Sequence, residues 1–394
     1  MTGRRVPFNK PFLVGTEMQY VADAAAAMHF SGDGAFTKRC QARLESMTGA
    51  HRALLTTSGT HALELAALLL DVGPGDEVIL PSFTFASTAN AFVLRGATPV
   101  FCDIRPDTLN LDERRVERLV TSRTRAIVAV HYAGVACEMD ELLSIARPRG
   151  IAVVEDNAHG LFGRYRSRPL GSIGVLAALS FHETKNISCG EGGGLLINDP
   201  VLVARAEILR EKGTNRAAFF RGEIDKYSWV DIGSSYLPSD ISAAFLWAQL
   251  ERADDIQARR RAIWERYAAE LASWAADQGV RLPIVPAHSE HPAHLFHVIL
   301  PSADDQAAFI DHMRVQGISA VFHYLPLHAS SAGRRWRHDL SDPCPVTEHV
   351  SSRLVRLPVY AELTEDLQRH VIATALQYTV RQAGRATAGS GRRD

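Results

Sequence analysis

Cysteine is scarce in this chain of 394 residues, and its pattern argues against two classes of site. The five cysteines are scattered and odd in number, and no pair of them forms a Cys-x-x-Cys motif: Cys40, Cys102, Cys137, Cys189 and Cys344. Disulfide frameworks and structural zinc sites need paired or closely spaced cysteines. We therefore expect free thiols in a reducing compartment, mostly buried as small apolar side chains, and no bound metal.

Long hydrophobic runs and an excess of charge of one sign are also absent. No apolar segment approaches the roughly 18 residues that cross a bilayer, and Arg4 and Arg5 are followed by Pro7 and Pro11 instead of an apolar secretory region. The 43 basic and 44 acidic residues give a formal net charge of −1. Neither nucleic acid nor an anionic membrane would be attracted to such a surface. We expect a cytoplasmic protein.

Apolar runs of strand length alternate with helical patterns between residues 50 and 200, which predicts an α/β fold. A mostly parallel central sheet with helices on both faces explains such alternation. Ligands of such sheets bind beyond the carboxyl ends of the strands. The expected strands are Glu77–Leu80, Thr98–Phe101, Ala126–Val130, Ile151–Val154, Leu176–Phe181 and Gly194–Ile197. The expected helices are Ala62–Leu70, Ser87–Leu94, Glu113–Val120 and Met139–Ala146.

The pattern changes in the second half of the chain. Helices are expected at 200–212, at 239–275 with a break near 254, at 304–316 and at 364–382, and strands at 295–300 and 318–322. We predict a large α/β domain over residues 1–255 and a smaller C-terminal α+β domain over 256–382. The Gly-, Arg- and Ser-rich tail, 383–394, is expected to be disordered.

Two strand ends carry residues whose pairing points to a pyridoxal phosphate enzyme. Lys185 lies in Ser-Phe-His-Glu-Thr-Lys-Asn, between a strand and the glycine-rich run 190–194, and Asp156 closes an earlier strand. Pyridoxal phosphate needs a lysine amine for its Schiff base and an acid that keeps the pyridine nitrogen protonated. A single lysine in a loop is usually a solvated charge, and an acid at the end of a strand usually caps the next segment. Their combination is what predicts the cofactor.

Further residues could complete the cofactor site. Gly59 and Thr60 open a strongly helical segment, and Ser180 lies just before the lysine loop, so both places could hold a phosphate. Phe85 follows a strand and could cover a planar ring, although core packing is the ordinary explanation. His159, three residues after Asp156, could bond the ring hydroxyl or be a structural histidine.

Several longer segments resemble the DegT/DnrJ/EryC1/StrS family of nucleotide-sugar aminotransferases. They include PGDEVILPSFTFASTANAFVLRGA (74–97), SFHETKN (180–186), REKGTNRAAFFRGEIDKYSWVDIGSSYLPSD (210–240) and AVFHYLPLH (320–328). Within the family they look most like the dTDP-4-amino-4,6-dideoxygalactose transaminases. The resemblance implies a fold-type I aminotransferase that forms a homodimer with shared active sites.

By that resemblance, each candidate takes a role. Lys185 would be the Schiff-base lysine and proton shuttle, and Asp156 the partner of the pyridine nitrogen. Gly59, Thr60 and Ser180 would hold the phosphate, Phe85 would cover the ring, and His159 would approach its hydroxyl, although many relatives have glutamine there. The sugar nucleotide would meet the following residues: Arg216, Arg221, Lys226, His323, Tyr324 and His328. In many relatives a residue of the neighbouring subunit, in the stretch that matches Ser234–Pro238, contacts the cofactor phosphate. We assign that contact to no single residue of this stretch.

The reaction implied is amino transfer from L-glutamate to C4 of a dTDP-4-keto-6-deoxyhexose, with pyridoxamine phosphate as the intermediate cofactor form. The galacto or gluco configuration of the product stays open. Three alternatives also remain: amination at C3 of a 3-keto sugar, a pyridoxal phosphate-binding regulatory protein, and a sugar dehydratase. Dehydratases of this fold replace the lysine with histidine, so Lys185 argues against the last.

Overall fold

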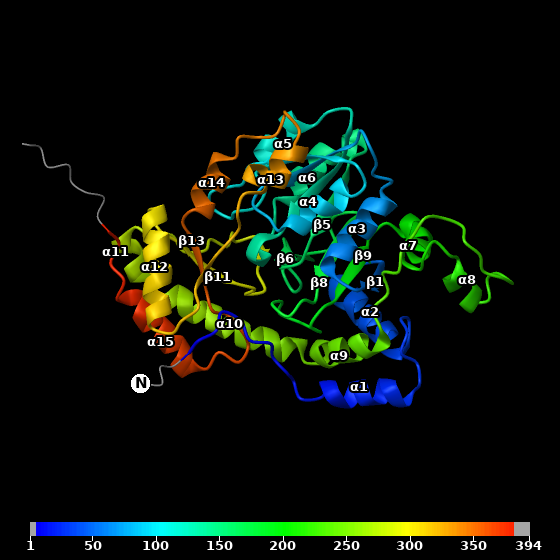
Figure 1. Cartoon of the computed structure of the whole chain (residues 1–394), viewed down its shortest axis with the longest axis horizontal. Helices are drawn as coiled ribbons and strands as arrows, with labels where there is room; N and C mark the ends of the chain where they lie inside the picture. Colours follow the sequence, from blue (N-terminus) through cyan, green and yellow to red (C-terminus); the bar gives the residue numbers. More distant parts are fainter. Residues whose placement is uncertain (1–4, 382–394) are drawn as a thin grey trace, which may run out of the picture.

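The computed structural model describes residues 5–381 and is organised around a seven-stranded sheet in the order β1-β9-β8-β5-β4-β2-β3 (Figure 1). β9 runs antiparallel to both of its neighbours, and the remaining pairs are parallel. The strands are β1 (Arg52–Thr56), β2 (Glu77–Pro81), β3 (Thr98–Cys102), β4 (Thr124–Val130), β5 (Ala152–Asp156), β8 (Leu176–Ser180) and β9 (Gly193–Ile197). The predicted α/β fold with a mostly parallel sheet is confirmed, and β1 is the strand of this sheet that the sequence analysis missed.

Helices cover both faces of this sheet, as predicted, because its strands are apolar on both sides. On one face the core is formed with α3 (Gly59–Leu69), α4 (Ala86–Val93) and α7 (Val203–Arg210). On the other face, α5 (Glu113–Leu119) and α6 (Met139–Ala146) cover β2 to β5. The rest of that face packs against α2 (Ala35–Thr48) and α9 (Asp240–Glu251), with α1 (Glu17–Ala26) outside them.

A buried carboxylate, Glu155, fixes the segment between β5 and β8. Glu155 accepts hydrogen bonds from the backbone N–H groups of Gly171, Ile173 and Gly174 at 2.7–2.8 Å. It also pairs with His131, whose Nε2 lies 2.9 Å from its carboxylate. These bonds lower the pKa of Glu155 against the opposing effect of burial, so the carboxylate stays charged. Asp156, the next residue, is thereby held at the sheet's carboxyl edge.

The C-terminal part contains a second sheet and its own core. The sheet is three-stranded and antiparallel, in the order β11-β13-β12. Figure 1 shows α11, α12 and α15 together on one side of the main sheet. The elements are α10 (Ala253–Glu270), α11 (Ala272–Gln278), β11 (Phe296–Ile299), α12 (Ala303–Val315), β12 (Val321–Phe322), α13 (Ser331–Trp336), α14 (Pro345–Ser351), β13 (Leu354–Leu357) and α15 (Glu365–Leu376). Val6 joins this core through an isolated parallel bridge to Ile318, so the N-terminal segment crosses to the C-terminal part. A small third sheet contains β6 (Arg164–Tyr165), β7 (Arg168–Pro169) and β10 (Ser289–Glu290).

Some element boundaries differ from the sequence-based expectation. The helix expected at 200–212 is a short 3-10 turn, Pro200–Leu202, followed by α7, which ends at Arg210. Lys212 and Gly213 have positive φ angles of 62° and 75°, so the helix cannot continue through them. The final helix ends at Leu376, and the tail expected to be disordered lies outside the described residues. The expected break near 254 occurs at Arg252, between α9 and α10.

Two absences apply to residues 5–381. No helix there is long and apolar enough to cross a membrane. Nor do those residues contain a group of three or more His, Cys, Asp or Glu side chains arranged to hold a metal ion. All five cysteines are free thiols, and four of them are buried.

Candidate active site

A cavity of about 730 Å³ lies between the carboxyl edge of the main sheet and the C-terminal sheet. From the main sheet it is lined by residues at or just beyond the ends of β2, β4, β5 and β8: Thr84, Phe85, Val130, Asp156 and Ser180. From the C-terminal part it is lined by residues of β12 and β13 and of the segment before β11: His294, Leu295, Val321 and Arg356. A site of this size and position suits a small molecule.

Lys185 lies in the wall of this cavity, in the turn that follows β8. Its backbone N–H donates to the carbonyl of His182 at 2.9 Å, which closes the turn. Burial lowers the pKa of its amine from the ordinary 10.5 to about 8, the Asp156 carboxylate opposes this shift, and the Arg356 charge adds to it. At pH 7 about 10% of such an amine is neutral, against about 0.03% at a pKa of 10.5. The cavity therefore prepares Lys185 to attack a carbonyl.

The pH dependence of cofactor loading tests this shift. Because only the neutral amine attacks, the rate at which cofactor-free protein forms an imine with pyridoxal phosphate should rise about tenfold per pH unit and level off above pH about 8. The growth of visible absorbance after mixing, followed across the pH range, measures it. A rate that keeps rising to pH 10 would show an unperturbed lysine.

Asp156 is buried at the end of β5 and is fixed by two hydrogen bonds. Thr88 donates its hydroxyl to Oδ2 at 2.7 Å, and the N–H of Ala158 donates to Oδ1 at 3.3 Å. The Thr88 hydroxyl in turn lies 2.8 Å from that of Thr84. With its orientation set in this way, the carboxylate faces the same cavity as Lys185.

The N-terminus of α3 forms an anion cradle at the cavity wall. Ser58 caps the helix by accepting the N–H of His61 at 3.1 Å, and Gly59 and Thr60 begin its first turn beside Ser180. A Cβ on Gly59 would lie 2.9 Å from the Cβ of Ser180, and one on Gly193 would lie 2.2 Å from the Ser58 carbonyl. The two glycines therefore let the helix end, β8 and β9 come together. Free N–H groups, the helix dipole and hydroxyls at one point are suited to a phosphate.

The opposite wall is a buried cluster of aromatic rings. His159 stacks on His294 with ring centroids 4.2 Å apart, and its Nε2 lies 3.4 Å from the hydroxyl of Tyr324. Burial, with the charges of Lys185 and Arg356, lowers the pKa of His159 well below its usual range, so the ring is neutral. Its Nδ1 is buried without a hydrogen-bond partner among the described residues, and is available to a ligand.

Two other predicted residues contribute to the cavity. His323 lies there with its Nδ1 3.1 Å from the hydroxyl of Tyr132. Phe85 is the residue before α4 and is 61% exposed, with its ring 6.4 Å from that of Tyr324. A large apolar ring left open at a cavity mouth is explained if it covers a ligand.

Four predicted site residues lie outside the cavity of this chain. His328 is buried between Ser82, 2.6 Å from its Nδ1, and Glu348, 3.2 Å from its Nε2, so both ring nitrogens already have partners. Arg216, Arg221 and Lys226 lie in or after α8 (Arg216–Phe220), on a segment that projects from the body of the protein (Figure 1). None of these four lines the cavity.

The structure also adds residues that the sequence analysis missed. Arg356 lies on β13, a strand that was not predicted, and His294 precedes β11 after Pro292. Thr88, inside α4, orients Asp156. The sequence signal that could have found Thr88 is its spacing of three residues from Phe85, which places both at the start of one helix.

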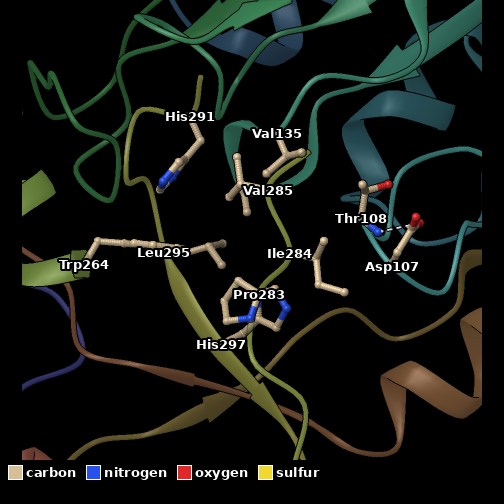
Figure 2. Close-up of a pocket in the computed structure, with 11 residues that line it drawn as sticks. Asp107, Thr108, Val135, Trp264, Pro283, Ile284, Val285, His291, Leu295 and His297 are labelled. Atoms are coloured by element: carbon tan, nitrogen blue, oxygen red, sulfur yellow. Dashed lines mark hydrogen bonds between the residues drawn. The ribbon is translucent and has the colours of Figure 1, made fainter. Parts of the chain in front are cut away.

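A second hollow, shown in Figure 2, is not suited to a substrate. Its volume is about 10 Å³, room for about one water molecule. Most of its walls are apolar, for example Ile284 and Val285, and Asp107 at its edge is bonded to the N–H of Thr108 and paired with Arg105. The chemistry is therefore assigned to the large cavity.

The residues of the large cavity fit pyridoxal phosphate. The cradle at α3 provides N–H groups and hydroxyls for a phosphate, and Asp156 provides a fixed carboxylate for a pyridine nitrogen. The unpartnered Nδ1 of His159 is a ready group for the ring hydroxyl, and Lys185 provides the amine. Each polar group of the cofactor thus has a matching group in one cavity.

Comparison with known proteins gives one consistent result. A sequence model of the DegT/DnrJ/EryC1/StrS aminotransferase family matches residues 12–376. The spore coat polysaccharide biosynthesis protein SpsC of Bacillus subtilis is 32% identical over 371 residues, covering 92% of this chain and 94% of SpsC.

Solved structures agree with the sequence match. The DesV protein of S. venezuelae, in complex with a ketimine intermediate, is 30% identical with a TM-score of 0.86, covering 96% of this chain and 99% of that one. The putative sugar aminotransferase Spr1654 of Streptococcus pneumoniae has a TM-score of 0.86 and 26% identity in its PLP form, covering 94% of this chain and 98% of that one. Its PMP form is 27% identical with a TM-score of 0.87 and the same coverage.

Proposed function

Because the chain belongs to the DegT/DnrJ/EryC1/StrS aminotransferase family, whose cofactor is pyridoxal phosphate, we propose that it aminates a nucleotide-linked keto sugar. The donor is L-glutamate, the acceptor is a dTDP-4-keto-6-deoxyhexose, and the product is a dTDP-4-amino-4,6-dideoxyhexose. The transfer is made to C4 of the sugar. The choice of sugar and of C4 follows from the resemblance of segments such as 210–240 and 320–328 to transaminases of that kind.

One observation carries the catalytic part of the proposal. Lys185, Asp156 and the α3 cradle come from three separate places in the sequence, yet all of them line one cavity. A surface lysine, a strand-end cap and an ordinary helix cap would have no reason to converge. Their convergence supports a cofactor held at its phosphate, its ring nitrogen and its aldehyde.

The chain's own residues divide the chemistry between them. The bound cofactor supplies an electron sink and carries the amino group between the two halves of the reaction. Asp156 holds a proton at the ring nitrogen, and Thr88 keeps its carboxylate in place. Lys185 removes the proton from Cα of glutamate and later delivers one to C4 of the sugar. A lysine with a pKa of about 8 exchanges protons readily in both directions at neutral pH.

The remaining residues bind and orient the substrates. Tyr324 and His323 offer hydrogen-bonding groups to the sugar, on the wall opposite the sheet. Phe85 covers the cofactor ring and keeps water away from it. The face on which Lys185 meets C4 decides between the galacto and gluco products.

We propose a homodimer in which each subunit completes its partner's site. The projecting segment around α8 exposes several large apolar side chains, a pattern typical of an interaction surface: Phe219, Phe220, Tyr227, Trp229, Val230 and Ile232. Arg216, Arg221 and Lys226 lie on this same segment and outside their own cavity. Reaching into the partner's cavity, they would meet the diphosphate of the nucleotide.

Turnover with a defined sugar tests the proposal. Protein loaded with pyridoxal phosphate is mixed with L-glutamate and dTDP-4-keto-6-deoxyglucose, and the product is isolated. Proton NMR should show an amine at C4, and the coupling of H4 should distinguish galacto from gluco. An amine at C3 from a 3-keto isomer, with no reaction at C4, would refute the proposed position. Failure with every keto sugar would favour a regulatory protein.

A further inference from the structure

The cavity contains a guanidinium for which residues 5–381 supply no acidic partner. Arg356 lies on β13 and lines the cavity. Its only hydrogen bond within residues 5–381 goes from Nη2 to the carbonyl of Phe322 at 3.2 Å, and its Nε is buried without any partner. Among those residues it forms no ion pair within 4.0 Å, in contrast to Arg105 and Arg210. A guanidinium presents five N–H donors, so most of its capacity is unused.

The strand pattern explains why Arg356 points into the cavity. Its neighbours Val355 and Leu357 belong to the C-terminal core, so Arg356 faces the other way, toward the main sheet. It lies opposite His297 on β11 and Val321 on β12. The ring of Phe8 lies 4.6 Å from its guanidinium carbon and holds the side chain in place through a cation–π contact.

Arg356 lines the same cavity as the reacting amine of Lys185. Its charge lowers the pKa of Lys185, and it adds to the effect of burial on the pKa of His159 and of His323. The acidic side chains in the cavity wall are Asp156 and Glu191, and neither is paired with it. The cavity thus combines a lysine amine that can attack a carbonyl with a partly dehydrated positive charge.

We propose that Arg356 binds the carboxylate of the amino donor that neighbours the reacting amine. This rests on the proposed function, because it requires an α-amino acid as donor. In such a donor the carboxylate and the amine are bonded to one carbon, so the group that binds the carboxylate must lie in the same cavity as Lys185, as Arg356 does. The diphosphate of a sugar nucleotide is separated from the reacting carbon by the sugar ring. We assign the diphosphate to Arg216, Arg221 and Lys226 on the partner's projecting segment. A planar carboxylate matches the guanidinium fork in two parallel hydrogen bonds.

The test measures donor binding apart from turnover. Glutarate, which has carboxylates but no amine, is titrated by calorimetry into wild-type protein loaded with pyridoxal phosphate. Arg356→Met should bind glutarate about 10- to 100-fold more weakly, the range expected for hydrogen bonds to a charged group, and Arg356→Lys should lie between the two. Affinity for dTDP should be unchanged in both variants.

Arg281→Met is the matched control. Arg281 is exposed, donates to one carbonyl at 3.2 Å and does not line the cavity, so its loss should leave glutarate binding intact. The visible spectrum and melting temperature of each variant report loading and folding. Equal glutarate affinity in wild type and Arg356→Met would overturn the proposal, as would a loss confined to dTDP. Failure to aminate any keto sugar, with the Arg356 effect intact, would count against the proposed function alone.

Discussion

The Lys185→Ala protein will bind pyridoxal phosphate without a covalent bond and lose amino transfer by on the order of 10⁴-fold. Two functions disappear together, the amine that holds the aldehyde and the base that moves the proton. The rate at which glutamate converts the bound cofactor to its amine form, followed by absorbance in a single turnover, measures the loss.

Lys38→Ala is the control for this change. Lys38 is exposed on α2 and is absent from the cavity, so its loss should leave the rate unaltered. If the Lys185→Ala protein, with its fold intact by circular dichroism, kept a rate within tenfold of the wild type, Lys185 could not be the proton carrier.

Asp156→Asn will keep the fold and the cofactor but lower kcat by on the order of 10²- to 10³-fold. The asparagine is the same size and can still accept the Thr88 hydroxyl, but it cannot hold a proton on the ring nitrogen by its charge. Removing one member of a buried charge pair costs about 3–5 kcal/mol, and a loss of about 3–4 kcal/mol in the transition state gives the expected fall in kcat. The carboxylate also raises the pKa of Lys185. Its loss should therefore move the pH midpoint for imine formation below about 8.

Asp305→Asn separates the catalytic effect from a general loss of stability. Asp305 is also buried, and its carboxylate accepts hydrogen bonds from the hydroxyls of Ser302 and Tyr378, but it lies in the C-terminal part. That variant should melt at a lower temperature and keep its kcat per loaded subunit. A near-normal kcat in Asp156→Asn, or a rise in the pKa of Lys185, would contradict the electron-sink role.

The main sheet could be predicted because its strands are short apolar runs bounded by turns. Six of its seven strands were found within a few residues. β1 was missed because Arg52–Thr56 leads directly into the helix-capping motif and lacks a turn signal between them. β6 and β7 were not predicted, because each has two residues and a strand of that length exists only through its tertiary neighbours.

The site was predictable where residue type and strand position act together. Asp156 ends one strand and Lys185 follows another, so their place at one edge could be inferred from the sheet alone. Arg356 could not, because arginine is usually exposed and nothing local indicates that β13 faces the cavity. His328 was expected to contact the sugar together with His323, but the 3-10 turn Leu327–Ala329 directs it toward Ser82 and Glu348. Such placements depend on how the two sheets pack.

The most direct measurement is to locate the covalent bond between the protein and its cofactor. The loaded protein is treated with borohydride, digested and mapped by mass spectrometry. The peptide that contains Lys185 should carry the mass of the reduced cofactor, and the same peptide from protein first incubated with glutamate should not. A label on any other lysine, or loaded protein without a label, would contradict the account.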